Sequence, residues 1–246
     1  MAQHWLDRSL PRLRAALNQA AHAAWLRSVD ALLHKAAPAA LASHRQLVRD
    51  AVQQRYEAAL QRHSARVPAA DPVAQGHLRA ACRTAATYGA VLPFARDSET
   101  LMQLLVHHAG LGAAPVLSAA RVAALLFAPD PMALAARLMR NMRLDYGMHG
   151  FAYDPETATS SDDVGIPPPM VITHCLYVSI LAEEGVPGLA RCCCCELDTR
   201  SFFGDADARP SALLSALRPS AAAVRVRLES SLARGDAACC IRVARA

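Results

Sequence analysis

The chain has 246 residues, of which 53% are hydrophobic and 19% charged, and 26 Lys and Arg against 21 Asp and Glu give a net charge of +5. This composition excludes a disordered chain, which would be poor in apolar residues, and the length suffices for a sizeable core. Of the Lys and Arg residues, all except Lys35 are arginines. They are scattered along the chain, and few aromatic residues lie between them. This pattern favours a solvated surface over a nucleic-acid-binding one, so we expect no nucleic-acid partner.

The sequence also predicts a cytoplasmic protein without a membrane partner. It has no apolar run of the roughly 18–20 residues that a membrane span needs. Charges and Pro11 interrupt the first residues, which are therefore unlike a signal peptide. Thiols stay reduced in the cytoplasm, so we interpret the cysteines as free thiols or metal ligands in preference to disulfide-bonded residues. They are Cys82, Cys175, Cys192, Cys193, Cys194, Cys195, Cys239 and Cys240.

The first 145 residues are expected to be helical, because apolar residues recur at spacings of three and four. Pro38 separates the first two helices. Asp71-Pro72 and Asp130-Pro131 each combine an N-cap aspartate with a proline at the first helical position. The predicted helices cover residues 5–35, 41–66, 73–91, 98–109, 117–127 and 131–145.

After Asp145 the sequence changes character. Residues 146–170 are rich in Gly, Pro, Ser, Thr and Asp and predict a loop with one short strand. Further on, Gly185 and Pro187 separate two helices, and VRVRLES, the turn RGDAA and CCIRV predict an antiparallel hairpin. The predicted strands cover 150–153, 171–175 and the two arms of this hairpin, and the predicted helices cover 176–184 and 188–201.

These elements predict an α+β fold, in which an all-helical N-terminal part is followed by a small antiparallel sheet packed with helices. The expected division lies near residue 145, with a helical region over 1–145 and an α+β domain over 146–246. For the helical region two roles stay open. It is either a cap over a pocket or the interface of a homodimer.

The run of four cysteines, Cys192 to Cys195, precedes Glu196, Leu197 and Asp198. Three explanations compete: a disulfide or metal knot, a reactive thiol with a polar partner, and compositional drift in an alanine-rich chain. Neighbouring cysteines are poor disulfide partners on geometric grounds. Cys195 and Asp198 are three residues apart and share a helix face, so we interpret this pair as functional and the other three cysteines as passengers or supporting residues.

Strand alternation predicts which other thiols point inward. In the last strand Cys239 shares the apolar face and Cys240 the opposite one. In strand 171–175, Val171, Thr173 and Cys175 are expected to share a face opposite Ile172 and His174, with Cys175 inward and His174 pointing away from it. Three segments therefore each offer one thiol, Cys175, Cys195 and Cys239, although any one of them also fits a small buried apolar residue.

Four segments carry a resemblance in the same order: VITHCLY, LAEEGVPGLA, CELD and VRVRLESSLARGDAACCIRV, over about residues 171–243. They resemble the L-2-amino-thiazoline-4-carboxylic acid hydrolase family. Its pattern is a strand ending in Cys, then a small or apolar residue and Tyr, followed by a helix-ending Gly, a Cys-x-x-Asp, and a hairpin with Gly, three residues and Cys. The matching residues are Cys175, Tyr177, Gly185, Cys195, Asp198, Gly235 and Cys239. Cys240 and Ile241 depart from it, since the family has Asp and an aromatic residue there.

The resemblance implies a hydrolase that opens a small cyclic amidine or thiazoline, in a specialised biosynthetic step. A cysteine thiolate would attack the carbon that carries nitrogen and sulfur, and Asp198 would transfer protons or orient water. The expected catalytic residues are Cys175, Cys195, Asp198 and Cys239. The expected substrate-binding residues are Tyr177, His174 and Arg227, of which the arginine would bind a carboxylate.

Two alternatives use the same side chains. Cys175, Cys195 and Cys239 would form a soft site for Zn²⁺ or another divalent metal, as in a non-enzymatic zinc–thiolate sensor or small-ligand module. CELD is also similar to the Cys-x-x-Asp of organomercurial lyases. No Walker A, GxGxxG, HExxH or GxSxG motif occurs in the sequence, which disfavours nucleotide-driven, dehydrogenase, zincin and serine-hydrolase functions.

Overall fold

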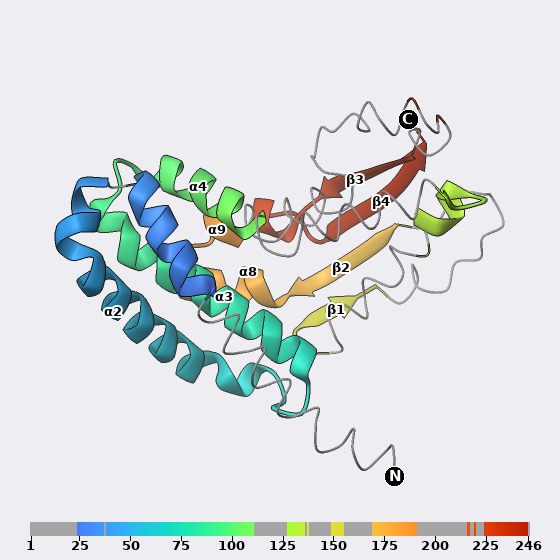
Figure 1. The fold of residues 1–246 in the computed structure, drawn as a ribbon. Helices are drawn as coiled ribbons and strands as arrows, with labels where there is room; N and C mark the ends of the chain where they lie inside the picture. The colour runs from blue at the N-terminus through green and yellow to red at the C-terminus, as the bar shows by residue number, and fades with distance from the viewer. Residues whose placement is uncertain are drawn as a thin grey trace, which may run out of the picture.

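The computed structural model describes residues 24–36, 38–110, 127–135, 137, 149–154, 169–190, 216, 219 and 224–245. The fold is α+β, with helices of the N-terminal part packed against a small antiparallel sheet (Figure 1). This confirms the predicted fold class. The described helices of the N-terminal part are residues 24–36, α2 (Pro38–His63), α3 (Pro72–Val91) and α4 (Ser98–Gly110), with 3₁₀ turns at Ser64–Arg66 and Leu92–Phe94.

The helix starts follow from local chemistry. The Asp71 carboxylate accepts hydrogen bonds from the backbone N–H groups of Val73 and Ala74, at 3.1 and 3.0 Å. Asp130 accepts from Met132 and Ala133 in the same way, at 2.9 and 3.1 Å. Both Asp-Pro starts are therefore confirmed as N-caps.

The remaining predicted helices are only partly described. Pro38 begins α2 instead of preceding it by three residues, because proline fits the first turn of a helix. Residues 131–135 and 137 are helical. The predicted helical residues 5–23 and 117–126, and those beyond 137, lie outside the described residues.

The sheet has the strand order β1-β2-β4-β3, and every neighbouring pair is antiparallel. The predicted final hairpin is confirmed as β3 and β4. The strands are β1 (Phe151–Tyr153), β2 (Met170–Cys175), β3 (Val224–Ser230) and β4 (Cys239–Arg245).

A bulge in β2 corrects one prediction. Ala152 pairs with His174 but the next residue, Tyr153, pairs with Ile172, so β2 contains one extra residue at Thr173. The alternation of faces shifts there. Cys175 is therefore inward together with Met170 and Ile172, and not with Val171 as simple alternation predicts.

β2 leads directly into α8 (Leu176–Glu183), which packs against α3 (Figure 1). Gly185 follows with a φ of +75°, and the backbone N–H of Val186 donates to the carbonyl of Leu181 at 2.8 Å. A positive φ is suited to glycine, as the predicted helix end requires. The next helix, α9, is described over Gly188–Ala190, and residues 191–201 of its predicted range lie outside the described residues.

The core joins both halves of the chain. One group of buried side chains combines Leu78 and Cys82 of α3 with Ile172 of β2, Ile180 of α8 and Ile241 of β4. A second group packs the helix at 24–36, α2 and α4 against Leu181, Leu189 and Ala190. The sheet and α8 thus bury their apolar surface against helices from before residue 145.

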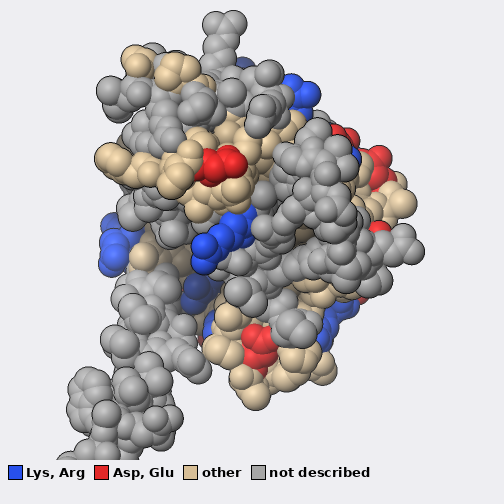
Figure 2. Space-filling model, turned by 90° about the vertical axis from the view of Figure 1, so that its right-hand side faces the viewer, with Lys and Arg blue, Asp and Glu red and all other residues tan. Residues whose placement is uncertain are grey.

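The surface mixes charges of both signs. On the face drawn in Figure 2, described Lys and Arg side chains alternate with Asp, Glu and uncharged surface, without one large basic patch among the residues drawn in colour. Of the helices that are described, none is both long enough and apolar enough to cross a membrane.

Candidate functional site

Cys175 lies where the sheet meets the helices. It ends β2, pairs with Phe151 of β1 and occupies the N-cap position of α8, and it is 3% exposed. Side chains at a helix N-terminus lie close to backbone N–H groups that have no intrahelical partner. The inward position predicted for Cys175 is confirmed, and His174 is exposed.

Tyr177 extends this site towards α3. Its hydroxyl oxygen and Nδ1 of His77 are 3.1 Å apart, a hydrogen bond between residues 100 positions apart in the sequence. Phe151 completes a cluster of three rings, since its ring centroid lies 5.4 Å from that of His77, in an edge-to-face arrangement, and 6.4 Å from that of Tyr177. Cys175, Tyr177, His77 and Phe151 form what we call the strand–helix junction.

His77 was missed by the sequence analysis. It lies in the helical half of the chain, far from every segment that carries the family resemblance. A single histidine in an amphipathic helix has no local pattern that couples it to a tyrosine on another element. Only the packing of α3 against α8 brings them together.

Cys239 has a defined structural environment. It is 4% exposed at the start of β4, opposite Ile172 of β2. Its Sγ accepts a hydrogen bond from the backbone N–H of Leu232 at 3.3 Å. The same thiol donates to the Ser231 hydroxyl oxygen, with 3.9 Å between Sγ and Oγ. Its predicted inward position is confirmed, and the thiol supports the loop between β3 and β4.

Two predicted substrate-binding residues lie on other surfaces. His174 is exposed beside the bulge in β2. Arg227 is exposed on β3 and pairs in register with Arg242 of β4, whose guanidinium binds Glu229 at 2.9 Å. The structure does not bring either residue to the buried side on which Cys175 and Cys239 lie.

The cysteine run and Asp198 lie outside the described residues, so the pairing of Cys195 with Asp198 stays a prediction. The free thiols among the described residues are Cys82, Cys175, Cys239 and Cys240. Within that part of the chain, no group of three or more His, Cys, Asp and Glu side chains is placed to hold a metal. The predicted metal ligands are Cys175, Cys195 and Cys239, and Cys195 lies outside the described residues.

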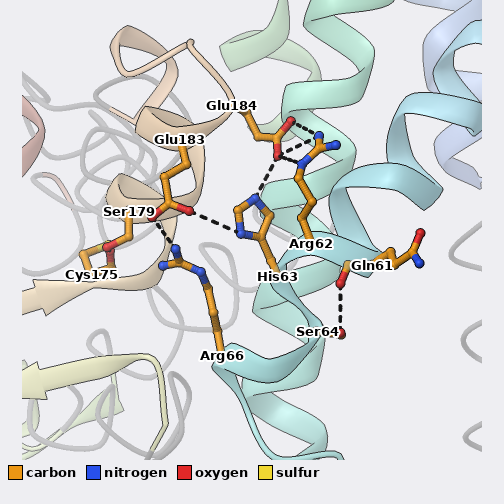
Figure 3. A network of polar contacts seen from close by, with 9 residues as sticks. All are labelled: Gln61, Arg62, His63, Ser64, Arg66, Cys175, Ser179, Glu183 and Glu184. Carbon is orange, nitrogen blue, oxygen red and sulfur yellow. Dashed lines mark hydrogen bonds and ion pairs between the residues drawn. The ribbon is translucent and has the colours of Figure 1, made fainter.

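A second polar cluster joins the end of α2 to the end of α8 (Figure 3). Arg62 binds the Glu184 carboxylate through Nε and Nη2, with its shortest contact at 2.7 Å. Nε2 of His63, whose side chain is 3% exposed, lies 2.8 Å from the same carboxylate. Arg66 and His63 also contact Glu183. These residues form what we call the α2–α8 cluster.

Cys82 lies fully buried near this cluster. Burial raises the pKa of its thiol to about 12, and the negative charge of Glu184 adds to the effect. A thiol with so high a pKa is a poor nucleophile near neutral pH. Cys82 is therefore a core residue, which accords with its absence from the predicted site.

Comparison with known proteins found no match, either to a protein-family model, to a curated protein or to a solved structure.

Proposed function

We propose that the protein is a hydrolase-like enzyme acting on a small cyclic amidine, a thiazoline or a related molecule that contains nitrogen and sulfur. The observation that carries this proposal is the strand–helix junction, where Cys175 occupies the N-cap position of α8 and the Tyr177 hydroxyl is hydrogen-bonded to His77. The proposal also rests on the resemblance of residues 171–243 to the thiazoline-carboxylate hydrolases.

The junction suits a thiol nucleophile. A cysteine at a helix N-terminus is near the positive end of the helix dipole, which favours the thiolate over the thiol. The hydrogen bond with His77 fixes the direction of the Tyr177 hydroxyl, so that this group is positioned to orient a substrate. We assign neither His174 nor Arg227 to the chemical step, because both are exposed on other surfaces.

The proposed reaction is a hydrolysis through a covalent adduct. The thiolate adds to the ring carbon that carries nitrogen and sulfur, and the ring C–N bond breaks as the nitrogen takes a proton. Water then adds to the same carbon and displaces the cysteine as thiolate. One water molecule is consumed, and the enzyme returns to its starting state. Asp198 is the proposed group that transfers the protons.

One observation favours a second candidate, a soft-metal-binding module. Cys175 and Cys239 are both buried thiols, on the paired strands β2 and β4. With Cys195 they would provide three thiolate ligands, a set suited to Zn²⁺. Both candidates need reduced thiols, which is why we propose a cytoplasmic location.

Metal analysis under reducing conditions separates the two candidates. Wild type is compared with Cys175→Ser, Cys195→Ser and Cys239→Ser, and with Cys240→Ser as the control on the outer face of β4. Near-stoichiometric zinc that is lost in the first three variants and kept in the control would replace the enzyme proposal with the metal module. The enzyme proposal predicts metal-free protein in which iodoacetamide modifies Cys195 rapidly.

A turnover assay tests the enzyme proposal directly. Cyclic amidines and thiazolines are screened for ring opening, and we expect Cys175→Ser to lower kcat/KM at least about a hundredfold on any substrate found. Circular dichroism confirms that the variant is folded, and Cys240→Ser should retain full activity. Equal turnover by Cys175→Ser and wild type would refute Cys175 as the nucleophile.

A further inference from the structure

A cavity of about 320 Å³ lies between α2, α3 and the turn that follows α8. Arg55 and Arg62 come from α2, and Glu184 from the turn. The rest of the lining is mostly apolar and consists of Gln54, Ala58, Ala85, Ala86, Gly89 and Val186. The cavity therefore has one charged side and one apolar side.

The two arginines are placed to act together. They are seven residues apart on α2, which is two helical turns, so both project from the same face. Arg62 uses Nε and Nη2 to bind Glu184, which leaves its Nη1 group without a partner among the described residues. Arg55, unlike Arg62, has no carboxylate partner among the described residues.

The Arg55 guanidinium lies next to Gly89 of α3. A Cβ atom at position 89 would come within 3.0 Å of Nη1 of Arg55. The absence of a side chain at this position lets the guanidinium lie against α3 at the edge of the cavity. The Arg55 side chain is exposed, with its guanidinium at the edge of the cavity.

We propose that this cavity binds a small organic monoanion with a carboxylate group and a compact apolar body. Arg55 and Arg62 contribute two positive charges and Glu184 one negative charge, so a single negative charge balances the site. A carboxylate matches the planar guanidinium groups in shape and hydrogen bonding. A doubly charged phosphate would be repelled by the Glu184 carboxylate. The alanines and Val186 would contact the apolar body.

This site is separate from the strand–helix junction. The cavity lies at the end of α8 and Cys175 at its beginning, and an eight-residue helix spans roughly 12 Å. The inference therefore does not rest on the proposed function. Loss of one site would leave the other in place.

Calorimetric titration with benzoate tests the proposal. We expect benzoate to bind at one site with a dissociation constant in the millimolar range, and benzamide, its uncharged analogue of similar shape, to bind at least about tenfold more weakly. Inorganic phosphate should not displace benzoate at equal concentration. Equal binding of benzamide, or displacement by phosphate, would overturn the choice of a carboxylate ligand.

Variants locate the binding site. Arg55→Gln should weaken benzoate binding by about tenfold, whereas Arg234→Gln, which removes an exposed arginine in the β3–β4 loop, should change it by less than about twofold. Ala58→Glu provides a second test, since it places a carboxylate on the cavity wall between the two arginines and should abolish binding. Unchanged affinity in Arg55→Gln and in Ala58→Glu would refute the site.

Discussion

At the scale of single residues, the described thiols differ in their surroundings more than their shared chemistry suggests. Cys82 is completely buried, and its pKa of about 12 results first from burial and then from Glu184. Cys240 is partly exposed, and its thiol donates to the Glu229 carboxylate at 3.3 Å. Partial burial, together with Glu229, raises its pKa as well. Exposure and ionisation together should set the order of their reactivity.

We predict that Cys82 is protected from alkylation in the native protein. A thiol with a pKa of about 12 contains about a thousandfold less thiolate at pH 8 than one with the ordinary value of 9.0. Cys240 is partly exposed and its pKa is raised less, so mass spectrometry after iodoacetamide treatment should find Cys240 modified long before Cys82. In urea the two rates should become similar. Rapid native modification of Cys82 would contradict its buried position.

Glu184 is the second residue whose environment is decisive. Burial alone would raise its pKa, but hydrogen bonds from Arg62 and His63 outweigh burial and hold the pKa below its ordinary value of 4.5. A lowered pKa means that the folded protein prefers the carboxylate. The resulting stabilisation is complete above pH 4.5 and is lost as the pH falls through the folded-state pKa.

For Glu184→Gln we predict a loss of about 1–3 kcal/mol in the free energy of unfolding at pH 7, because Arg62 and His63 lose a charged hydrogen-bond partner. The difference from wild type should shrink below pH 4.5, where the wild-type carboxylate becomes protonated. Urea titrations at several pH values measure both effects. Glu57→Gln, at an exposed position of α2, is the control and should cost less than about 0.5 kcal/mol. A difference that grows towards low pH would contradict this assignment.

At the scale of elements, caps and turns determine where helices and strands begin and end. The loop between β3 and β4 shows this most clearly. The Ser231 N–H donates to Asp236 at 2.7 Å, the Ser230 hydroxyl donates to the Ala238 carbonyl at 2.8 Å, and Gly235 has a φ of +89°. The loop is thus held by its own side chains, with glycine at the residue that needs left-handed backbone.

Two glycine-to-alanine variants should change stability in opposite directions. Gly235→Ala should lower the free energy of unfolding by about 1–2 kcal/mol, because its φ is unfavourable for a residue with a Cβ. Gly76→Ala, within α3, should raise it by about 0.5–1 kcal/mol through helix propensity. An added Cβ would meet no atom within 4 Å at either position. The two stability changes therefore reflect backbone conformation and not side-chain packing. Thermal unfolding measures both, and equal effects would contradict the backbone explanation.

At the scale of the whole molecule, the core does not stop at residue 145. Leu78 and Cys82 of α3 share one cluster with Ile172, Ile180 and Ile241. Arg62 and Arg66 add ion pairs between the N-terminal helices and the end of α8. The predicted division into residues 1–145 and 146–246 thus separates elements that bury one another's apolar surface.

From this we predict that residues 146–246 do not fold by themselves. Removal of α3 would expose the apolar faces of β2 and α8, and a domain of this size cannot lose so large a part of its core. The fragment should unfold without a cooperative thermal transition and should bind a hydrophobic dye, whereas the full chain should unfold cooperatively. A sharp transition in the fragment would instead support an independent domain.

Local patterns were sufficient for much of this fold. The Asp-Pro starts, the helix-ending Gly185 and the final hairpin all depend on residues within a few positions of one another, so the sequence predicts them. The inward positions of Cys175 and Cys239 were also predicted correctly. The sequence did not predict correctly which residues of β2 share a face with Cys175. The bulge at Thr173 changes the alternation, and it results from pairing with β1, about twenty residues away.

By itself, then, the amino-acid sequence determined the fold class, most boundaries of the elements that the structure describes and the burial of the two strand thiols, because propensity, capping and alternation act over short distances. Only the tertiary structure decided that His77 meets Tyr177, that Glu184 joins Arg62 and His63, and that Arg55 and Arg62 border a cavity. Both contacts join residues on different elements, and the cavity has walls from α2, α3 and the turn after α8. Their positions follow from how α3 packs between α2 and α8, which depends on the summed burial of many side chains and not on any local motif.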